Sequence, residues 1–510
     1  RTIDYIKKHK NIDIELYKIP LDDKKVFEML SQGDSTGVFQ LESPGIRKIM
    51  KRLKPNKLED IVALLALYRP GPLQSGMVDD FINRKNGKEK IEYPHKNLEI
   101  ILKETYGVIL YQEQVMKIAS YMANYSLGEA DLLRRAMGKK NFAIMRENRE
   151  KFIQRAVENN YTEEKADEIF ELIDKFAGYG FNKSHSVAYA MISYWTAYLK
   201  AHYPAFYFAA VMTSEISETG DVAYYFNDAK EHRISIYPPN VNTPSAYFEI
   251  KNDGISYSLA AIKNLGLNLA KKIVKDYEKH GAYTKLDEFV LRNKKNGINK
   301  RALEALILSG ALDELEGNRK EKFLSIDKVL DFVSKAPKTD EIQQMNLFGA
   351  ASKTINKFAL TNSDDFNLDE KLTKEKEFLG FYLSSHPLDK YKDIITAFSI
   401  NKLSEIDVEE SKVIKTFGTI TGLKKVLTKK DEQMALFSIL CYDRIISCIA
   451  FPKTYDKFLE EIIEKKTVYI EGKIQIDEYK GEKTIKLLVE KIISLDKLYD
   501  YPAKKIFILI

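Results

Sequence analysis

The stretch Gly178-Tyr-Gly-Phe-Asn-Lys-Ser-His-Ser186 joins a glycine loop to a long apolar segment. Two glycines let the backbone come close to a bound group, and Asn182 or Ser184 is a suitable N-cap for the helix that follows. The first N–H groups of a helix lie at the positive end of its dipole, which favours anions. The stretch therefore predicts a loop that binds a phosphate-bearing ligand. The apolar residues 186–203 predict a helix that is buried on nearly all sides, with its aromatic side chains in the core.

A second cationic element lies upstream. Ser126 and Glu129 have the spacing of a capping box, and the helix that they open ends in Leu132-Leu-Arg-Arg-Ala-Met-Gly-Lys-Lys140. Arg135 and Lys139 are four residues apart and share a face of that helix. This helix end is a further candidate contact for a charged ligand.

Five stretches of the chain resemble, in the same order, the fingers region of the bacterial DNA polymerase III alpha subunit family. They are Gly37-Val-Phe-Gln-Leu-Glu-Ser43, Tyr68-Arg-Pro-Gly-Pro-Leu73, Ile109-Leu-Tyr-Gln-Glu-Gln114, Leu132 to Lys140 and Gly178 to Ser186. The resemblance runs through nearly the whole chain. It implies template-directed DNA synthesis in chromosomal replication.

The resemblance also implies roles for individual residues. Contacts with the incoming triphosphate are implied for Arg134, Arg135 and Lys139. The residues implied to lie beside the nascent base pair and its sugar are Tyr179, Phe181, Asn182, Lys183 and His185. Among them, His185 is expected to lie against the sugar and to exclude a 2′-hydroxyl. Arg69 is either a phosphate contact or a buried capping group.

Nucleotide addition also needs carboxylates that hold two Mg²⁺ ions. By resemblance, the metal-binding aspartates belong to a palm domain that precedes the position of Arg1, so no catalytic or metal-binding residue is expected in this chain. The acidic pairs at 22–23, 79–80 and 364–365 are expected to be surface or capping residues, because neighbours on a helix point about 100° apart. We expect the full-length protein to be a DNA-directed DNA polymerase and this piece alone to be inactive.

Composition limits the other functions. The 510 residues are too many for a single core, and a net charge of +6 is small for this length, so nucleic-acid contacts must come from local patches. The two cysteines make a disulfide framework improbable and predict a reducing, cytoplasmic compartment. No apolar run has membrane-spanning length.

The pattern along the chain predicts a mostly α-helical protein with a C-terminal all-β domain. With the names that the resemblance implies, the parts are the end of a palm with helical fingers over 1–205, a clamp-binding domain with a helix-hairpin-helix over 206–333, a flexible linker over 334–365, a helical connector over 366–410 and an OB-fold over 411–500.

Residues 261–270 resemble a helix-hairpin-helix element, which presents backbone N–H groups to DNA phosphates. Lys263, Asn264 and Gly266 are the candidate DNA contacts. Asn264 replaces the first hairpin glycine and is expected to adopt the left-handed conformation that asparagine tolerates. A second copy is predicted to end near residues 306–312. An ordinary helical pair without DNA contact is the alternative.

The predicted linker contains Gln344-Met-Asn-Leu-Phe348, which resembles the sliding-clamp-binding motif of bacterial polymerases. Gln344 would make a hydrogen bond at the rim of the clamp pocket, and Met345, Leu347 and Phe348 would complete the apolar contact. The alternative is a linker segment that packs on its own protein.

Five alternating segments between about 411 and 495, with a helix pattern between the third and the fourth, have the order of an OB-fold. Lys424 and Lys425 flank its first hairpin and could line a groove for a single strand. A solvated lysine face is an equally good account, and OB-folds also bind proteins.

The partners implied by the family are primer-template DNA, deoxynucleoside triphosphates, the sliding clamp (beta subunit), the clamp loader subunit tau and the proofreading exonuclease. A non-catalytic DNA-binding or replisome-assembly protein built from the same modules is the first rival, although simple DNA binding needs no nucleotide site such as Arg134, Arg135 and His185 suggest. An error-prone paralogue is the second.

Overall fold

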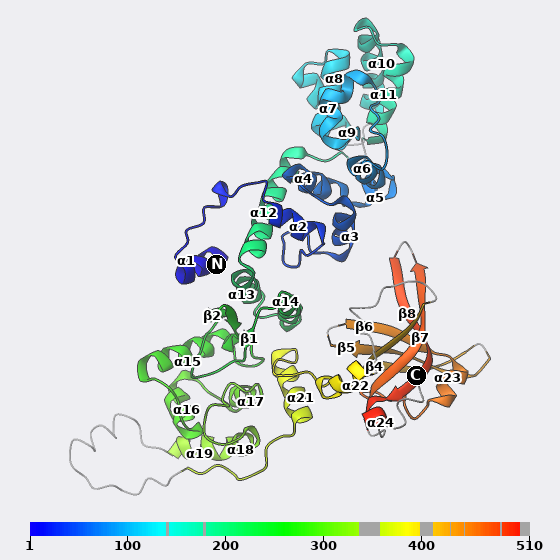
Figure 1. Ribbon diagram of the computed structural model, residues 1–510. Helices are drawn as coiled ribbons and strands as arrows, with labels where there is room; N and C mark the ends of the chain where they lie inside the picture. Colours follow the sequence, from blue (N-terminus) through cyan, green and yellow to red (C-terminus); the bar gives the residue numbers. More distant parts are fainter. Residues whose placement is uncertain are drawn as a thin grey trace. The chain divides into compact units, whose positions relative to one another are not determined.

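The computed structural model describes residues 1–138, 142–176, 180–335, 358–397, 412–428, 430–442, 444–479 and 482–499 (Figure 1). Contacts divide the chain into two units. The first unit comprises Arg1–Tyr237 and Tyr247–Ser258, and the second comprises Pro238–Ala246 and the residues from Leu259 onward.

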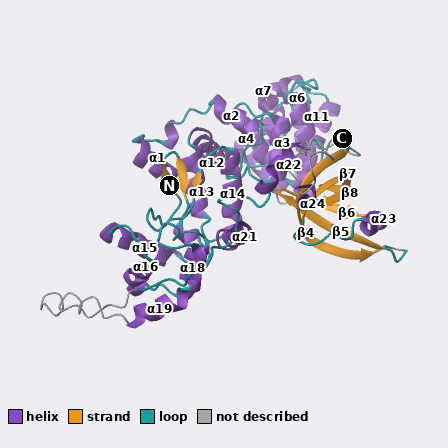
Figure 2. Cartoon of the chain, turned by 60° about the horizontal axis from the view of Figure 1, so that its bottom comes forward, coloured by secondary structure: helices purple, strands orange, loops and turns teal. Residues whose placement is uncertain are grey.

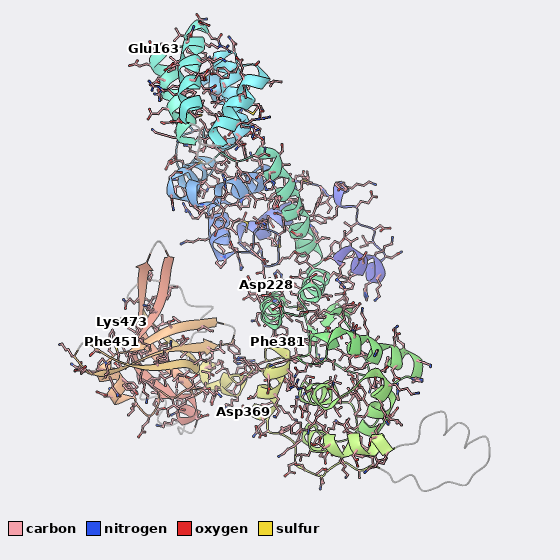
Figure 3. All side chains as sticks on the ribbon, turned by 180° about the vertical axis from the view of Figure 1, so that it is seen from behind. Glu163, Asp228, Asp369, Phe381, Phe451 and Lys473 are labelled. Atoms are coloured by element: carbon pink, nitrogen blue, oxygen red, sulfur yellow. The ribbon has the colours of Figure 1, made fainter. Side chains whose placement is uncertain are left out.

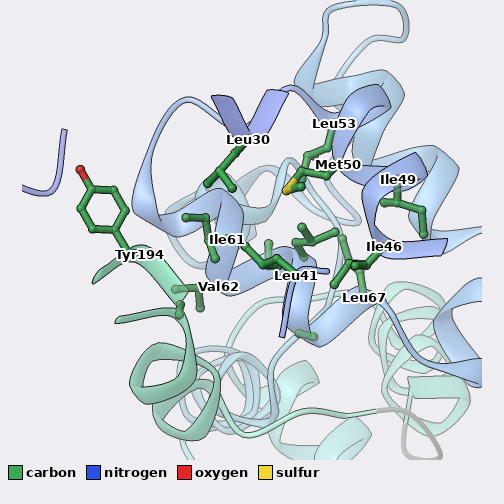
Figure 4. Close-up of a cluster of buried hydrophobic side chains, with 14 of the residues drawn as sticks. Leu30, Leu41, Ile46, Ile49, Met50, Leu53, Ile61, Val62, Leu67 and Tyr194 are labelled. Carbon is green, nitrogen blue, oxygen red and sulfur yellow. The ribbon is translucent and has the colours of Figure 1, made fainter. Parts of the chain in front are cut away.

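The first unit contains two helical lobes with separate apolar cores. The first lobe consists of α2 (Lys24–Ser31), α3 (Pro44–Leu53), α4 (Leu58–Leu67), α5 (Pro70–Gln74), α6 (Met77–Lys85) and α12 (Lys183–His202). Helix α4 is apolar on nearly all sides and lies against α12. Figure 4 shows this core, in which Tyr194 of α12 lies near Leu30 of α2 and Val62 of α4.

The second lobe consists of the 3-10 helices Lys96–Leu98 and Lys103–Thr105 with α7 (Glu99–Leu102), α8 (Gln112–Ala123), α9 (Leu127–Gly138), α10 (Phe142–Glu158) and α11 (Glu163–Phe176). Its helices are amphipathic, and their apolar faces meet around Phe152 and Phe170. The capping box predicted at the start of α9 is present, because Glu129 accepts the Ser126 N–H (N···O 2.9 Å) and Ser126 accepts the Glu129 N–H (3.3 Å).

The remainder of the first unit surrounds a small sheet. Helices α1 (Thr2–Lys10), α13 (Pro204–Ser214) and α14 (Thr219–Glu231) accompany a sheet of order β1–β3–β2, formed by Ile236–Tyr237, Gly254–Ser256 and Glu249–Lys251. The hydroxyl of Tyr5 donates to the carbonyl of Phe248 across 2.8 Å. Elements beyond the predicted boundary at residue 205 therefore pack with the first unit.

The helical part of the second unit contains two helix-hairpin pairs. A 3-10 turn (Leu259–Ala261) leads into α15 (Leu267–His280), and α16 (Leu286–Asn293) leads through a 3-10 turn (Lys294–Asn296) into α17 (Lys300–Leu308). Helices α18 (Arg319–Leu324), α19 (Ile326–Lys335) and α21 (Leu368–Leu379) follow. The predicted second helical pair is thus present, with its hairpin at 294–299.

The segment predicted as a flexible linker is anchored beyond its central part. Residues 336–357, which include Gln344, Met345, Leu347 and Phe348, lie outside the described residues. Directly after them, the ring of Phe358 lies 5.6 Å (between centroids) from that of Phe332 on α19. Thr361 N–H then donates to Ser325 Oγ (2.8 Å). Residues 358–365 therefore pack on the helical domain.

The C-terminal part is a closed five-stranded barrel, coloured orange in Figure 2. Its strands are β4 (Val413–Leu427), β5 (Gln433–Cys441), β6 (Arg444–Ala450), β7 (Thr467–Tyr479) and β8 (Glu482–Ser494), in the order β4–β5–β6–β8–β7. Strands β4 and β7 close the barrel, and β6 pairs with β8 in parallel. This topology confirms the predicted OB-fold, and helix α23 (Pro452–Lys457) lies between the third and the fourth strands, as predicted.

The residues between α21 and the barrel in the second unit pack on the outside of the barrel. The 3-10 helix Asp389–Tyr391, α22 (Lys392–Ala397) and α24 (Leu495–Tyr499) share a small core with outward residues of the barrel strands. None of the helices in the described ranges combines the length and the apolar character needed to cross a membrane.

Candidate nucleotide site

Two distant segments meet where the two lobes of the first unit join. The N–H of Phe181 donates to the Leu110 carbonyl (N···O 3.4 Å), and the N–H of Gln112 donates to the Phe181 carbonyl (2.9 Å). Gly180 is required at this junction, since an added Cβ would lie 2.9 Å from the Phe176 ring and 3.0 Å from Gln112 Cγ. Residues 177–179, including Tyr179, lie outside the described part of the chain.

Helix α12 begins with the predicted cap, but its N-terminus is already occupied by a carboxylate. The Asn182 side chain accepts the His185 N–H (2.8 Å), so Asn182 rather than Ser184 is the N-cap. The Lys183 N–H donates to both Glu113 oxygens (3.1 and 3.0 Å). Glu113 thus provides the negative charge that the helix dipole favours. In this structure the N–H groups of Lys183 and His185 thus have protein partners, and binding of a phosphate at this helix start stays a prediction.

The side chain of Lys183 is also paired. Its Nζ lies 2.6 Å from Glu104 Oε2 and 5.4 Å from the centre of the Tyr111 ring. Lys183 therefore supports the junction of the lobes. Its partner lies 79 positions away, so no local pattern could indicate this pair.

Arg134 and Arg135 project from α9 and share one carboxylate. Asp131 Oδ1 accepts from Arg134 Nε (2.9 Å), and its Oδ2 accepts from Arg135 Nε (2.7 Å). The hydrogen bond from Arg134, together with that from Arg135, lowers the pKa of Asp131 below its ordinary value. Arg135 is 65% exposed and Arg134 31%, so two cations against one anion leave a positive surface. Lys139 lies outside the described residues.

Gln112 connects the arginines to the loop. Its Oε1 accepts from Arg134 Nη1 (3.3 Å), and its Nε2 donates to the Gly180 carbonyl (3.1 Å). Three of the five stretches that resemble the family thus meet at one side chain. No role was predicted from the sequence for Gln112 or Glu113. The feature that could have indicated one is a pair of polar residues at a helix start, directly after the short apolar stretch 108–111.

A row of rings extends from this junction along α12. Arg69 lies over Phe181, with 4.3 Å from its Cζ to the ring centre. His185 follows at 5.7 Å from Phe181 and at 4.4 Å from Tyr189, and Tyr189 is 5.5 Å from Phe39 (all between ring centroids). The remaining two stretches are therefore in contact with the same surface.

Helix α12 is consequently not buried on all sides. Tyr189 and Ile192 are 36% and 39% exposed, and His185 is exposed. The expectation that the aromatic side chains of this helix lie in the core is therefore wrong for Tyr189. Arg69 stacks on Phe181 and its Nε donates to the Ala66 carbonyl (2.9 Å). Because Ala66 lies in the last turn of α4, this hydrogen bond is of the capping type, and the same guanidinium also supports the ring row.

One aspartate of each acidic pair is bonded to other groups of the protein. Asp23 caps α2 through Val26 N–H (3.0 Å) and bonds His202, Asp79 pairs with Arg52, and Asp365 accepts the Phe366 N–H. One cluster of metal-ligand type occurs in the described residues, formed by Asp34, Asp228 and His232. The Nζ of Lys200 already lies between its carboxylates, at 2.6 Å from Asp34 and 2.9 Å from Asp228.

The two hairpins of the second unit share a hollow of about 570 Å³. Asn264 has a φ of +71°, as predicted for the position of the first hairpin glycine. The hollow is lined by Asn264, Gly266, Asn268 and Lys272 from one hairpin pair and by Asn296 and Asn299 from the other. Lys263 is not part of this lining; its backbone N–H donates to the Phe378 carbonyl (2.9 Å).

Lys424 and Lys425 do not lie on one face of the barrel. Lys424 pairs with Leu436 and Lys425 with Ala435, and neighbouring residues of a strand point to opposite faces. The Nζ of Lys425 lies 6.0 Å from the centre of the Tyr455 ring. These two lysines therefore do not form a single groove.

Two family models match this chain. Residues 1–160 match the finger domain of the bacterial DNA polymerase III alpha subunit, and residues 233–322 match the helix-hairpin-helix motif. The fold and these matches define the class, a polymerase subunit in which fingers are followed by a helix-hairpin-helix domain and an OB-type barrel.

Relatives cover almost the whole chain. The DNA polymerase III subunit alpha of Aquifex aeolicus is 43% identical over 96% of this chain, that of Borreliella burgdorferi 38% over 100%, and that of Escherichia coli K12 37% over 96%. The chain belongs to the bacterial DNA polymerase III alpha subunit family. It spans 40%, 45% and 43% of the lengths of these three relatives.

A solved structure of a mitochondrial single-stranded DNA-binding protein from S. cerevisiae is 18% identical, covering 17% of this chain and 97% of its own. The TM-score is 0.15, which is too low for an inference about the fold.

Proposed function

We propose that this chain is the part of a replicative DNA polymerase that positions the incoming nucleotide, contacts DNA and attaches to the clamp. The observation that carries the proposal is the convergence of the five family stretches on one exposed surface. Arg134 and Arg135 lie at one side of it, and the row from Phe181 to Tyr189 lies at the other. Cations for a triphosphate and rings for a base pair are thereby brought together.

The chemistry assigned to this chain is positioning and charge stabilisation. In phosphoryl transfer these two effects supply most of the catalysis. The arginines would bind the triphosphate, and His185 would lie beside the sugar. As the resemblance to the family implies, we propose that the metal ions are held by a part of the polymerase outside these 510 residues, and that the chain alone does not extend a primer.

The test of this function is the discrimination between deoxyribonucleotides and ribonucleotides in the complete polymerase. Replacing His185 by alanine is expected to lower the ratio of the two kcat/KM values by on the order of tenfold, since a steric contact with the sugar is removed. His185→Phe keeps a ring beside Tyr189 and is expected to retain most of the discrimination. An unchanged ratio in His185→Ala would place the sugar elsewhere.

We extend the proposal to the hairpins. Helices α15 and α17 direct their N-termini at the hollow that both hairpins line, and helix N-termini favour anions. Lys272 is the charged residue among those that line the hollow. This composition suits contact with the sugar-phosphate backbone of DNA, which does not depend on the base sequence. The DNA contact proposed here includes Lys272 and Asn296, which sequence reasoning missed.

Clamp attachment is proposed for Gln344, Met345, Leu347 and Phe348, in the context of a holoenzyme that also contains a clamp loader and a proofreading exonuclease. Support comes from the motif and from the anchored residues on both sides of 336–357. Two buried apolar anchors contribute roughly 1.5–3 kcal/mol each, and DNA inside the ring keeps the clamp at high effective concentration.

Replacing Leu347 and Phe348 together by alanine is therefore expected to weaken clamp binding by at least about a hundredfold. Isothermal titration of the purified clamp into the chain measures this loss. The matched control replaces Leu291 and Leu324, which are 43% and 49% exposed in the same unit, and should leave the affinity unchanged. Equal affinities of the test variant and the wild type would assign the clamp contact to other residues.

A further inference from the structure

Gln112 is the first residue of α8, and its backbone and side chain contact both sides of the candidate nucleotide site. Its backbone N–H holds the Phe181 carbonyl, and its side-chain amide spans from Arg134 Nη1 (3.3 Å) to the Gly180 carbonyl (3.1 Å). The side chain is half-buried. Helix α9 carries the arginine, whereas Gly180 belongs to the loop before α12.

The chemistry of the two contacts requires an amide. Arg134 needs an acceptor, and the Gly180 carbonyl needs a donor. A carboxylate would satisfy the first and repel the second, and an amine would do the reverse. An uncharged side chain that accepts and donates at about the length of glutamine satisfies both without neutralising the guanidinium.

A second feature shows that the approach of Gln112 to the loop is built into the fold. A Cβ at position 180 would lie 3.0 Å from Gln112 Cγ, which is closer than side chains normally pack. The absence of a side chain at Gly180 therefore makes room for this glutamine. Asp131 is the other partner of Arg134, so the guanidinium is held from its own helix by Asp131 and from the neighbouring helix by Gln112.

We propose that Gln112 is a positioning residue that couples Arg134 to the glycine loop, so that the triphosphate contact and the base-pair contact are set in one geometry. This inference rests on the proposed nucleotide site. Gln112 acts through Arg134 and Gly180 and need not touch the nucleotide. Its loss is expected to affect nucleotide use and to leave DNA affinity unchanged.

The test is a double-mutant cycle in the complete polymerase. Gln112→Met keeps the length of the side chain and removes both hydrogen bonds, and we expect kcat/KM for the nucleotide to fall about tenfold or more, because one bond is to a charged group. In an Arg134→Ala background the same change is expected to alter kcat/KM by less than about twofold. Retention of the wild-type melting temperature by each variant, measured by circular dichroism, controls for folding. Gln154→Met, at an exposed position of α10, is the matched control.

Gln112→Glu separates the two bonds, because it keeps the acceptor for Arg134 and loses the donor for Gly180. An intermediate kcat/KM supports the coupling, whereas a value equal to that of wild type or of Gln112→Met shows that only one bond matters and overturns it. Independent, multiplicative effects of Gln112→Met and Arg134→Ala also overturn it. If Arg134→Ala by itself has no effect, the proposed nucleotide site fails, and the two failures are thereby distinguished.

Discussion

Replacing Lys200 by methionine is expected to lower the free energy of unfolding by about 3–5 kcal/mol. Lys200 is fully buried on α12, and its ammonium contacts Asp34 (2.6 Å), Asp228 (2.9 Å) and the Thr36 carbonyl (3.2 Å). Asp228 is labelled in Figure 3. Methionine fills the volume of the lysine stem but leaves two carboxylates without their shared cation. The loss arises from those uncompensated charges.

Urea unfolding followed by circular dichroism measures this change. Lys18→Met is the matched control, since Lys18 is 74% exposed and forms a surface ion pair with Glu15; its effect should stay within about 0.5 kcal/mol. A loss below about 1 kcal/mol for Lys200→Met would mean that the carboxylates find other partners, with His232 as the nearest candidate.

The pH dependence of the same variant provides a separate prediction. Burial raises the pKa of Asp34, but hydrogen bonds and charges from His232 and Lys200 outweigh it and lower the pKa from 3.8 to about 2. Because the pKa of Asp34 is lower in the folded protein than in the unfolded chain, its ionisation stabilises the fold at pH values above the pKa of the unfolded chain. This contribution is lost as the pH falls toward the pKa of the folded protein. The stability difference between wild type and Lys200→Met should therefore narrow between pH 4 and pH 2.

The second large effect is expected at the arginines. Arg135→Ala in the complete polymerase should lower turnover at saturating DNA and nucleotide by about 2–4 kcal/mol, on the order of 30-fold to 1,000-fold, because a charge-assisted contact with the reacting triphosphate is removed. The guanidinium is 65% exposed, and its partner in the described part of the chain is Asp131 of its own helix, so it can turn to a ligand. DNA affinity should change little.

Single-turnover kinetics and DNA titration distinguish this role from a DNA-backbone contact. Arg146→Ala is the control, since Arg146 is 85% exposed on the neighbouring helix α10. Weaker DNA binding with unchanged turnover would show that the cations contact the duplex instead.

Local features were predictable from the sequence because their causes are local. The capping box at Ser126 and Glu129, the cap at Asn182 and the left-handed Asn264 each depend on residues within a few positions. The barrel was predictable because the alternation along each strand reports which face is buried. The order of the strands then followed from their number and from the position of one helix.

The contacts that decide the site depend on distant residues and were not predictable. Glu113 occupies the helix start from 70 positions away, and Lys183 is paired with Glu104 from 79. The residues of α12 are apolar on nearly all sides, yet one face of this helix is exposed. The loop before it is fixed by hydrogen bonds of Gly180 and Phe181 with Leu110 and Gln112, which are far away in the sequence. The periodicity of apolar residues identifies a helix, but it does not show which of its faces lack a packing partner.

The packing of Phe358 against Phe332 places the described residues on either side of 336–357 on one helical domain. The chain is described up to Lys335 on α19, and it is attached to that domain again at Phe358, Ala359 and Thr361. The entropic cost of closing a loop grows only slowly with its length. A change in the number of residues between these two fixed ends would therefore leave the hairpins and the residues that follow Thr361 in place. The proposed clamp contact could change in this way without altering the proposed DNA contact.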